Sequence, residues 1–208
     1  MQTEIRVQPR PSERWFGPLY VRRPSPEMVA SVVARMSGAS FTYGPVGATR
    51  DQLPVGWVHD AVEEVVGDGE TAWHRAVLAL RSWAQFDLAW VTPHDRRVPL
   101  EPGATFAFVS RQLGLWSVNV CRVVYTIDET VDGVRRFGFA YGTVGSHVLK
   151  GEERFLLEQG PDGQVRFSIV KFSLPAHPVV TLAGPFARRV QRRFSTDAVA
   201  RIRRSAVS

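Results

Sequence analysis

The second half of the chain contains short runs in which apolar and polar residues alternate, a pattern typical of β-strands. Six such runs lie between residues 86 and 173: FDLAWV, TFAFVS, WSVNVCRVVYTID, VRRFGFAYGT, EERFLLEQ and QVRFSIVKFS. The sequence VDGV separates two of these runs and predicts a tight hairpin turn. Because successive hairpins produce antiparallel pairing, we expect one antiparallel sheet in this region.

Helical patterns lie on both sides of this region. Before it, residues 25–38 predict a short helix capped by Ser25, and GETAWHRAVLALRSWAQF predicts a second helix. After it, apolar residues recur at four-residue spacing and predict a long amphipathic helix that Gly184-Pro185 should interrupt near its start. The residues of this stripe are Phe186, Val190, Phe194, Ala198 and Ile202. The sheet needs a covering layer, so the order of elements predicts an α+β domain in which this helix covers the sheet.

The sequence GPDG fixes the register of the last predicted hairpin. A type I turn with Gly163 in the left-handed position pairs Gly160 with Gln164. Counting back from this turn gives three facing pairs, which are Leu157 with Phe167, Phe155 with Ile169, and Glu153 with Lys171. Two apolar pairs mark this face as inward, so Glu153 and Lys171 should point inward too. Such an ion pair is costly unless it is hydrated or well bonded. It therefore lies either at the open end of the sheet or in a polar part of a cavity.

Alternation assigns inward faces to two further strands. One strand carries Phe137, Phe139 and Tyr141 on a single face. In the strand before it, we take the face with Asn119 and Tyr125 as inward, because Arg122 on the opposite face is better placed in solvent. A few polar groups in an aromatic wall are usual in small-molecule pockets, although buried polar groups with backbone partners give the same pattern. The predicted ligand-binding residues are Asn119, Tyr125, Phe137, Phe139, Tyr141, Phe155 and Phe167.

The glycine-containing stretch FGFAYGTVGSHVLKGEERF, residues 137–155, resembles a phosphate loop only superficially. A Walker loop ends in Gly-Lys-Ser/Thr, whereas here Lys150 precedes Gly151 and Glu152 follows. The dinucleotide pattern requires a helix after its glycines, and the element expected here is a strand. The stretch is better explained as one strand, a loop and the next strand.

No specific catalytic or metal-binding motif is present in the sequence. It contains no G-x-S-x-G elbow, and Ser146 and His147 are direct neighbours, which rarely gives triad geometry. The five histidines lack metal-ligand spacing and the chain has one cysteine, so we expect neither a metal site nor a cofactor. The candidates for acid–base chemistry are the titratable residues near the expected cavity: Glu153, Lys171, Tyr141, His147 and Tyr125.

The net charge of +6 is concentrated in arginines near the C-terminus. Seven arginines lie between residues 186 and 204 beside one acid, Asp197. They are Arg188, Arg189, Arg192, Arg193, Arg201, Arg203 and Arg204. We interpret them as a solvated helix face, with peripheral contact to an anionic membrane as the alternative. Nucleic acid is disfavoured as a partner because no aromatic residues alternate with these arginines.

The remaining bulk features suggest an intracellular protein with one main domain. The chain has 208 residues, a single cysteine, Cys121, and no long apolar run or secretory signal pattern. We therefore expect a cytoplasmic location. Residues 1–25 are rich in Pro and Arg and predict an extended arm. We divide the chain into residues 1–37, the arm with its short helix, and residues 38–208, the sheet-and-helix domain.

Long segments of the chain resemble a known family. They are FTYGPVGATR, LRSWAQFDLAWV, LEPGATFAFVSRQLGLWSVNVCRVVYTID, FGFAYGTVGSHVLKGEERFLLEQ and VRFSIVKFSLPAHPVVTLAGPFARRVQRRF. Over residues 41–204 the sequence is similar to the bacterial and plant family called domain of unknown function 1990. The resemblance implies a START-like, helix-grip fold similar to that of the birch pollen allergen. In this fold a curved antiparallel sheet wraps around a long C-terminal helix, with an internal cavity between them.

The resemblance implies a function without naming catalytic residues. The wider superfamily includes carriers of lipids, sterols and plant hormones, together with aromatic-polyketide cyclases. We therefore expect the protein to bind a small hydrophobic or aromatic molecule in the cavity between helix and sheet. The alternative is an enzyme of secondary metabolism, such as a cyclase, dehydratase or isomerase, that uses the same cavity.

Overall fold

The computed structural model describes residues 19–207 except residues 146 and 183. Most of the predicted arm, residues 1–18, and Ser146 therefore lie outside the described residues. In chain order the elements are β1 (Leu19–Tyr20), α1 (Pro26–Met36), β2 (Val58–Asp68), α2 (Gly69–Arg81), β3 (Val91–Pro93), β4 (Thr105–Gln112), β5 (Leu115–Val131), β6 (Val134–Thr143), β7 (Leu149–Gln159), β8 (Gln164–Pro175), α3 (Pro178–Leu182) and α4 (Gly184–Val207).

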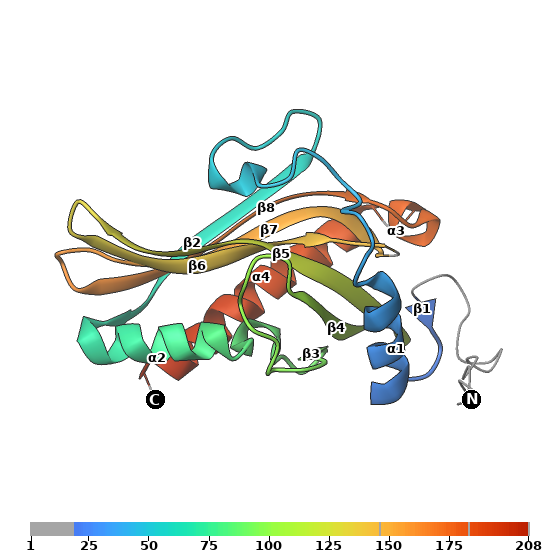
Figure 1. The fold of residues 1–208 in the computed structure, drawn as a ribbon, viewed down its shortest axis with the longest axis horizontal. Helices are drawn as coiled ribbons and strands as arrows, with labels where there is room; N and C mark the ends of the chain where they lie inside the picture. The colour runs from blue at the N-terminus through green and yellow to red at the C-terminus, as the bar shows by residue number, and fades with distance from the viewer. Residues whose placement is uncertain (1–18, 146, 183, 208) are drawn as a thin grey trace, which may run out of the picture.

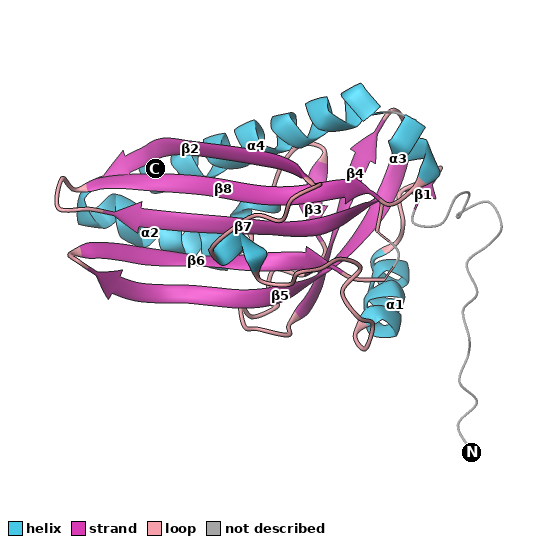
Figure 2. Cartoon of the chain, turned by 90° about the horizontal axis from the view of Figure 1, so that it is seen from above, coloured by secondary structure: helices cyan, strands magenta, loops and turns pink. Residues whose placement is uncertain are grey.

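A single antiparallel sheet contains the described strands. Its order is β2-β8-β7-β6-β5-β4-β3, and β1 pairs with the start of β5. The sheet curves around α4, and α2 lies on the same side of it (Figure 1). Seen from above, the long strands β5 to β8 run side by side across the molecule (Figure 2). This arrangement confirms the predicted α+β helix-grip fold.

Both predicted hairpin turns are confirmed. Asp132 and Gly133 have positive φ angles of 52° and 75°, as the tight turn between β5 and β6 requires. In the turn between β7 and β8, Gly163 has a φ of 78° and its N–H donates to the carbonyl of Gly160 at 3.0 Å. The register that follows from this turn is the predicted one, so Glu153 faces Lys171 across the two strands.

The predicted helix at residues 69–86 ends at Arg81, and two strands differ more strongly from the sequence prediction. Strand β2 was not predicted, because its sequence VHDAVEEVVGD contains several charged residues. These charged residues are tolerated because β2 is an edge strand, which pairs with β8 alone among the described strands.

The predicted strand FDLAWV is wrong. Ala84–Phe86 forms a 3-10 turn, and strand β3 begins only at Val91. Trp83 and Phe86 are fully buried here, so their apolar pattern reflects packing of a turn rather than a strand.

A β-bulge in β5 reverses the predicted direction of Tyr125. Val123 pairs with Tyr141, but Tyr125 pairs with Ala140, so the register shifts by one residue between them. One extra residue moves every later side chain to the opposite face. The hydroxyl of Tyr125 therefore lies on the outer face of the sheet, 2.8 Å from the hydroxyl of Thr49. The prediction that Tyr125 points into the cavity is wrong.

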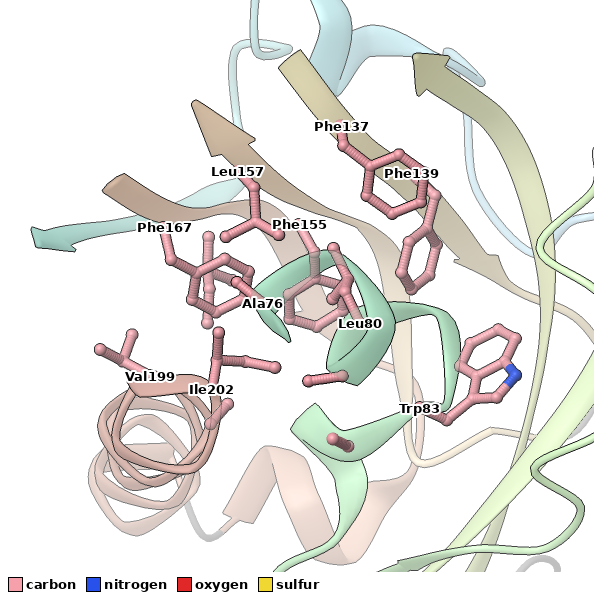
Figure 3. Packing of buried hydrophobic residues seen from close by; sticks show 14 of the residues in the cluster. Ala76, Leu80, Trp83, Phe137, Phe139, Phe155, Leu157, Phe167, Val199 and Ile202 are labelled. Carbon is pink, nitrogen blue, oxygen red and sulfur yellow. The ribbon is translucent and has the colours of Figure 1, made fainter. Parts of the chain in front are cut away.

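The main hydrophobic core lies between the sheet and the two long helices. Figure 3 shows aromatic side chains of the sheet, such as Phe139 and Phe155, facing Leu80 of α2 and Ile202 of α4. All four of these side chains are fully buried. A second apolar cluster forms on the opposite face of the sheet, where Val29 and other α1 residues pack on β4 and β5. The sheet is thus covered on both faces, by different helices.

A buried carboxylate holds the segment 42–57 on the outer face of the sheet (Figure 1). Glu152 accepts hydrogen bonds from the Tyr43 hydroxyl at 2.6 Å, the Gly47 N–H at 2.7 Å and the Thr49 N–H at 2.9 Å. The Thr49 hydroxyl is a fourth donor to the same carboxylate. Because the carboxylate oxygens are saturated by loop donors, Glu152 has a structural role.

Replacing this carboxylate should destabilise the protein. In Glu152→Gln, one acceptor oxygen becomes an NH₂ group that faces loop donors. Each donor left unpaired should lower the free energy of unfolding by about 1–3 kcal/mol. Chemical denaturation measures this change. Glu63→Gln, at an exposed position of β2, is the matched control and should unfold like the wild type. Equal stability of the two variants would contradict the role assigned to Glu152.

Candidate functional site

A cavity of about 250 Å³ lies between the sheet and the first half of α4. Its apolar wall includes Phe108 of β4, Leu115 of β5, and Val190 and Phe194 of α4. The predicted apolar stripe of α4 thus has two functions. Its first part lines the cavity, whereas Ala198 and Ile202 are buried in the core. The volume is slightly below the roughly 300–1,000 Å³ typical of pockets for drug-sized ligands.

Three polar side chains from neighbouring strands form the floor of the cavity, and a fourth, Asp60, continues their row to the edge strand β2. Tyr141 of β6 pairs with Glu153 of β7, Glu153 with Lys171 of β8, and Lys171 with Asp60 of β2. We call these four residues the polar row. The next row along the same strands is Phe139, Phe155, Ile169 and Val62. That row belongs to the hydrophobic core, whereas Tyr141, Glu153 and Lys171 line the cavity. The polar row therefore marks the level at which the packed core ends.

Short polar contacts connect the members of the polar row. The Tyr141 hydroxyl donates a hydrogen bond to Glu153 Oε2. Lys171 Nζ lies 3.4 Å from Glu153 Oε1 and 3.4 Å from Asp60 Oδ2. Glu153 and Lys171 are only 7% and 6% exposed, so their ion pair lies inside the cavity wall rather than at an open end of the sheet. Of the two interpretations of this pair, the structure supports the cavity.

The helix α4 is attached to the polar row through the same lysine. Lys171 Nζ donates to the hydroxyl of Ser195 at 2.8 Å and to the backbone carbonyl of Gln191 at 3.2 Å. Gln191 and Ser195 are one turn apart on the face of α4 that points at the sheet. Because a buried ammonium needs several acceptors, these contacts fix the distance between α4 and β8 at this level.

Burial determines the protonation of Tyr141. Removal from water raises the pKa of the Tyr141 hydroxyl well above its ordinary value, and the nearby charge of Glu153 raises it further. The hydroxyl therefore keeps its proton at neutral pH and acts as the donor to Glu153. The thiol of Cys121 is also fully buried, and its pKa is raised by the same two causes.

Three further polar side chains of the cavity wall hold atoms without a hydrogen-bond partner among the described residues. They are Asn119 Oδ1, His147 Nε2 and Gln112 Nε2. The other ring nitrogen of His147 accepts the Leu149 N–H at 3.0 Å and lies 2.9 Å from the Leu149 carbonyl. Burial lowers the pKa of His147 to about 4, so its imidazole is neutral at pH 7. The described residues therefore leave the hydrogen-bonding capacity of these three buried atoms unused.

The structure brings together only part of the predicted site. Asn119, Tyr141, His147, Glu153 and Lys171 line the cavity. Four predicted ligand-binding aromatics lie instead in the packed core beyond the polar row: Phe137, Phe139, Phe155 and Phe167. Alternation correctly assigned their face, but it carries no information about position along the strand. Tyr125, on the outer face, is separated from the cavity by the sheet.

Several functional residues were not predicted from the sequence. Asp60 was missed together with strand β2, and Ser195 was not among the residues singled out from the sequence. A detectable signal for Ser195 was its position on α4 next to the apolar stripe, one turn after Gln191. Trp90 was also missed. It lines the cavity, and its indole N–H donates to Asp197 of α4 at 2.8 Å.

Part of the arginine-rich face of α4 is engaged in local ion pairs. The pairs are Arg193 with Asp197, Arg201 with Asp87, and Arg203 with Glu64. Arg193 also lies over the ring of Trp90, 4.9 Å from its centroid. Within the described part of the chain, no helix is long and apolar enough to cross a membrane.

The curved sheet, the long C-terminal helix and the cavity between them define a helix-grip protein. Residues 42–201 match the family described as Domain of unknown function (DUF1990), and the chain belongs to this family. A UPF0548 protein of Deinococcus radiodurans is 36% identical over 184 residues, covering 83% of this chain and 91% of that protein. A UPF0548 protein of Arabidopsis thaliana is 31% identical over 143 residues, covering 67% of this chain and 69% of the relative.

Solved structures of similar shape include Ara h 8.0201 and the di-domain ARO/CYC StfQ from the steffimycin biosynthetic pathway. Ara h 8.0201 has a TM-score of 0.48 and 13% identity, over 73% of this chain and 99% of that chain. StfQ has a TM-score of 0.45 and 13% identity, over 72% of this chain and 51% of that chain.

His147 should make the stability of the fold depend on pH. Its pKa is about 4 in the folded protein against an ordinary value of 6.5. Below pH 6.5 the unfolded chain therefore binds more protons than the folded one, and stability is lost as the pH falls toward 4. Between pH 7 and pH 5 this loss should amount to about 2 kcal/mol.

Denaturation of the wild type and of His147→Gln at both pH values measures this contribution. The variant should lack this part of the pH dependence, whereas His74→Gln, at an exposed position of α2, should retain it. The same pH dependence in His147→Gln and in the wild type would contradict the assignment.

Proposed function

We propose that this protein binds one small, largely apolar molecule in the cavity between the sheet and α4. The observation that carries the proposal is the make-up of the cavity wall. Apolar side chains of β4, β5 and α4 form most of it, and polar groups converge in the polar row at its floor. An apolar cavity with a few well-placed polar groups is the usual form of a small-molecule site.

The contrast between the two halves of the interior supports this proposal. Protein interiors are normally packed with few voids larger than a water molecule. On the core side of the polar row the interior is closely packed, and Phe155, Phe167 and Ile202 are fully buried in one cluster. On the other side of the polar row, the same sheet and the same helix line a cavity of about 250 Å³. A cavity of this size beside a dense core is expected where a ligand completes the packing.

The edge of the cavity also suits an apolar ligand. Leu113, between β4 and β5, and Phe186, at the start of α4, both line the cavity. They are 79% and 39% exposed, so the apolar wall continues to the protein surface there. Large apolar side chains exposed at the edge of a concave site are typical of ligand entrances. A molecule with low solubility in water would meet apolar surface along its whole path.

Filling the cavity should abolish ligand retention. Ala187 lines the cavity, so Ala187→Trp places an indole inside it. Thr196→Trp, on the exposed side of the same helix, is the matched control. We expect native mass spectrometry of the protein purified from its own host to show one added small molecule on the wild type and on Thr196→Trp, and none on Ala187→Trp. Retention by Ala187→Trp would contradict the proposed site, as would a wild type that carries no molecule and takes up no naphthalene-sized compound.

Acid–base catalysis on the bound molecule is the second candidate function. It is supported by the contact between Tyr141 and Glu153, which places a proton donor and a carboxylate side by side in an apolar cavity. A cyclase, dehydratase or isomerase needs little more than a shaped pocket and one positioned acid or base.

Turnover measurements test this second candidate. Incubation with metabolites produced by neighbouring genes should reveal a product, and Glu153→Gln or Tyr141→Phe should lower kcat by about 10²–10⁴-fold. Glu63→Gln, far from the cavity on the exposed side of β2, should leave kcat unchanged. Unchanged turnover in both cavity variants would exclude these residues from catalysis.

A further inference from the structure

Most donors of the polar row make hydrogen bonds inside the protein. The Tyr141 O–H is directed at Glu153 Oε2. Lys171 has three N–H groups, of which two are taken by the Ser195 hydroxyl and the Gln191 carbonyl. The third lies between Glu153 Oε1 and Asp60 Oδ2, each 3.4 Å from the nitrogen. In the polar row, the Tyr141 O–H and two N–H groups of Lys171 are thus used inside the protein, and the third N–H of Lys171 is held only at ion-pair distance. The unpaired donors of the cavity wall, Gln112 Nε2 and His147 Nε2, lie outside the polar row.

Acceptor capacity, in contrast, remains on the same surface. The Tyr141 oxygen donates its only proton to Glu153, so its lone pairs are left for another donor. Glu153 Oε1 has no hydrogen-bond partner among the described residues, since Lys171 approaches it only at ion-pair distance. The polar row therefore retains unused acceptor capacity, and of its two acceptors Glu153 Oε1 is itself buried.

A further acceptor belongs to Asn119 of β5, four residues along the strand from Val123, the partner of Tyr141. Asn119 Nδ2 lies 2.9 Å from the Ser117 hydroxyl and 3.4 Å from the Phe108 carbonyl. A carbonyl oxygen only accepts, so the amide nitrogen must occupy this side and the amide oxygen the other. Asn119 Oδ1 is then a buried acceptor without a hydrogen-bond partner among the described residues. Both Asn119 and Tyr141 line the cavity.

The charge of the polar row restricts the ligand further. The row contains two acids, Glu153 and Asp60, and one base, Lys171. A ligand carboxylate would place another negative charge and more acceptor lone pairs against this surface. An ammonium group would suit the charge, but it would have to lose its water shell within an otherwise apolar wall. A neutral donor satisfies the acceptors without either penalty.

We propose that the molecule bound in this cavity carries a neutral hydroxyl group, as a phenol or an alcohol, at the end that reaches the polar row. The hydroxyl donates to the Tyr141 oxygen, and the rest of the molecule contacts the apolar wall that includes Phe108 and Phe194. This inference rests on the proposed function of the cavity and adds the chemical class and the orientation of the ligand.

Three compounds that share a naphthalene ring test this inference on the wild-type protein. They are 2-naphthol, 2-methoxynaphthalene and 2-naphthoate, with affinities measured by isothermal titration calorimetry. The methoxy compound keeps the oxygen but has no proton to donate. We expect 2-naphthol to bind about 10-fold more tightly than 2-methoxynaphthalene, the effect of one net hydrogen bond. The carboxylate should bind least tightly of the three.

Two tyrosine variants locate the hydrogen bond. Tyr141→Phe should weaken 2-naphthol binding about 10-fold and leave 2-methoxynaphthalene binding unchanged. Tyr43→Phe is the matched control, because Tyr43 makes a similar contact with a buried glutamate on the outer face. This control should leave both affinities unchanged. The three compounds on the wild type remain decisive if Tyr141→Phe fails to fold.

The outcomes separate this inference from the proposed function. If 2-naphthol and 2-methoxynaphthalene bind equally, or if 2-naphthoate binds most tightly, the hydroxyl assignment is overturned while the cavity remains a binding site. If 2-naphthol binds preferentially but Tyr141→Phe leaves the preference intact, the assigned acceptor is wrong. If none of the three compounds binds the wild type, both the inference and the proposed function fail.

Discussion

The arrangement of this protein depends on one buried ammonium group. A lysine charge inside a protein requires opposite charge and hydrogen-bond acceptors, since its transfer from water is otherwise costly. Lys171 obtains them from Glu153 and Asp60 on the strands to either side and from Ser195 on α4. These contacts connect β2, β7, β8 and α4 at one level. Apolar side chains fill the interior on one side of this level and line a cavity on the other.

Two adjacent glutamates in β7 show how the same residue type serves structure and function differently. Glu152 and Glu153 point to opposite faces of the sheet because side chains alternate along a strand. Loop donors saturate Glu152, which leaves it no capacity for a ligand. Glu153 is paired with Lys171 and accepts from Tyr141, yet one of its oxygens has no hydrogen-bond partner among the described residues. Unsatisfied capacity, rather than burial alone, makes Glu153 the functional candidate.

The sequence was most informative where turn residues fix register. The turn at Gly163 was enough to place Glu153 opposite Lys171 on the inward face, and the structure confirms it. Tyr125 was assigned to the wrong face because the alternation of residues 119–123 does not reveal the β-bulge that follows Val123. Asp60 was missed because the edge strand β2 contains several charged residues and therefore lacks the apolar pattern from which strands were predicted. The core aromatics, such as Phe139, were assigned to the correct face of the sheet, but they lie in the packed core and not along the cavity. That position depends on α2, which lies beneath one end of the sheet (Figure 1) and contributes Ala76 and Leu80 to the core there.

The central claim is that the polar row is the floor of a ligand site and not a buried ion pair of structural value only. A crystal structure of the protein soaked with 2-naphthol tests this claim most directly. We predict a naphthalene ring between α4 and the sheet, with its oxygen within hydrogen-bond distance of the Tyr141 hydroxyl. A cavity filled by protein side chains, or a ring bound elsewhere on the molecule, would contradict the claim.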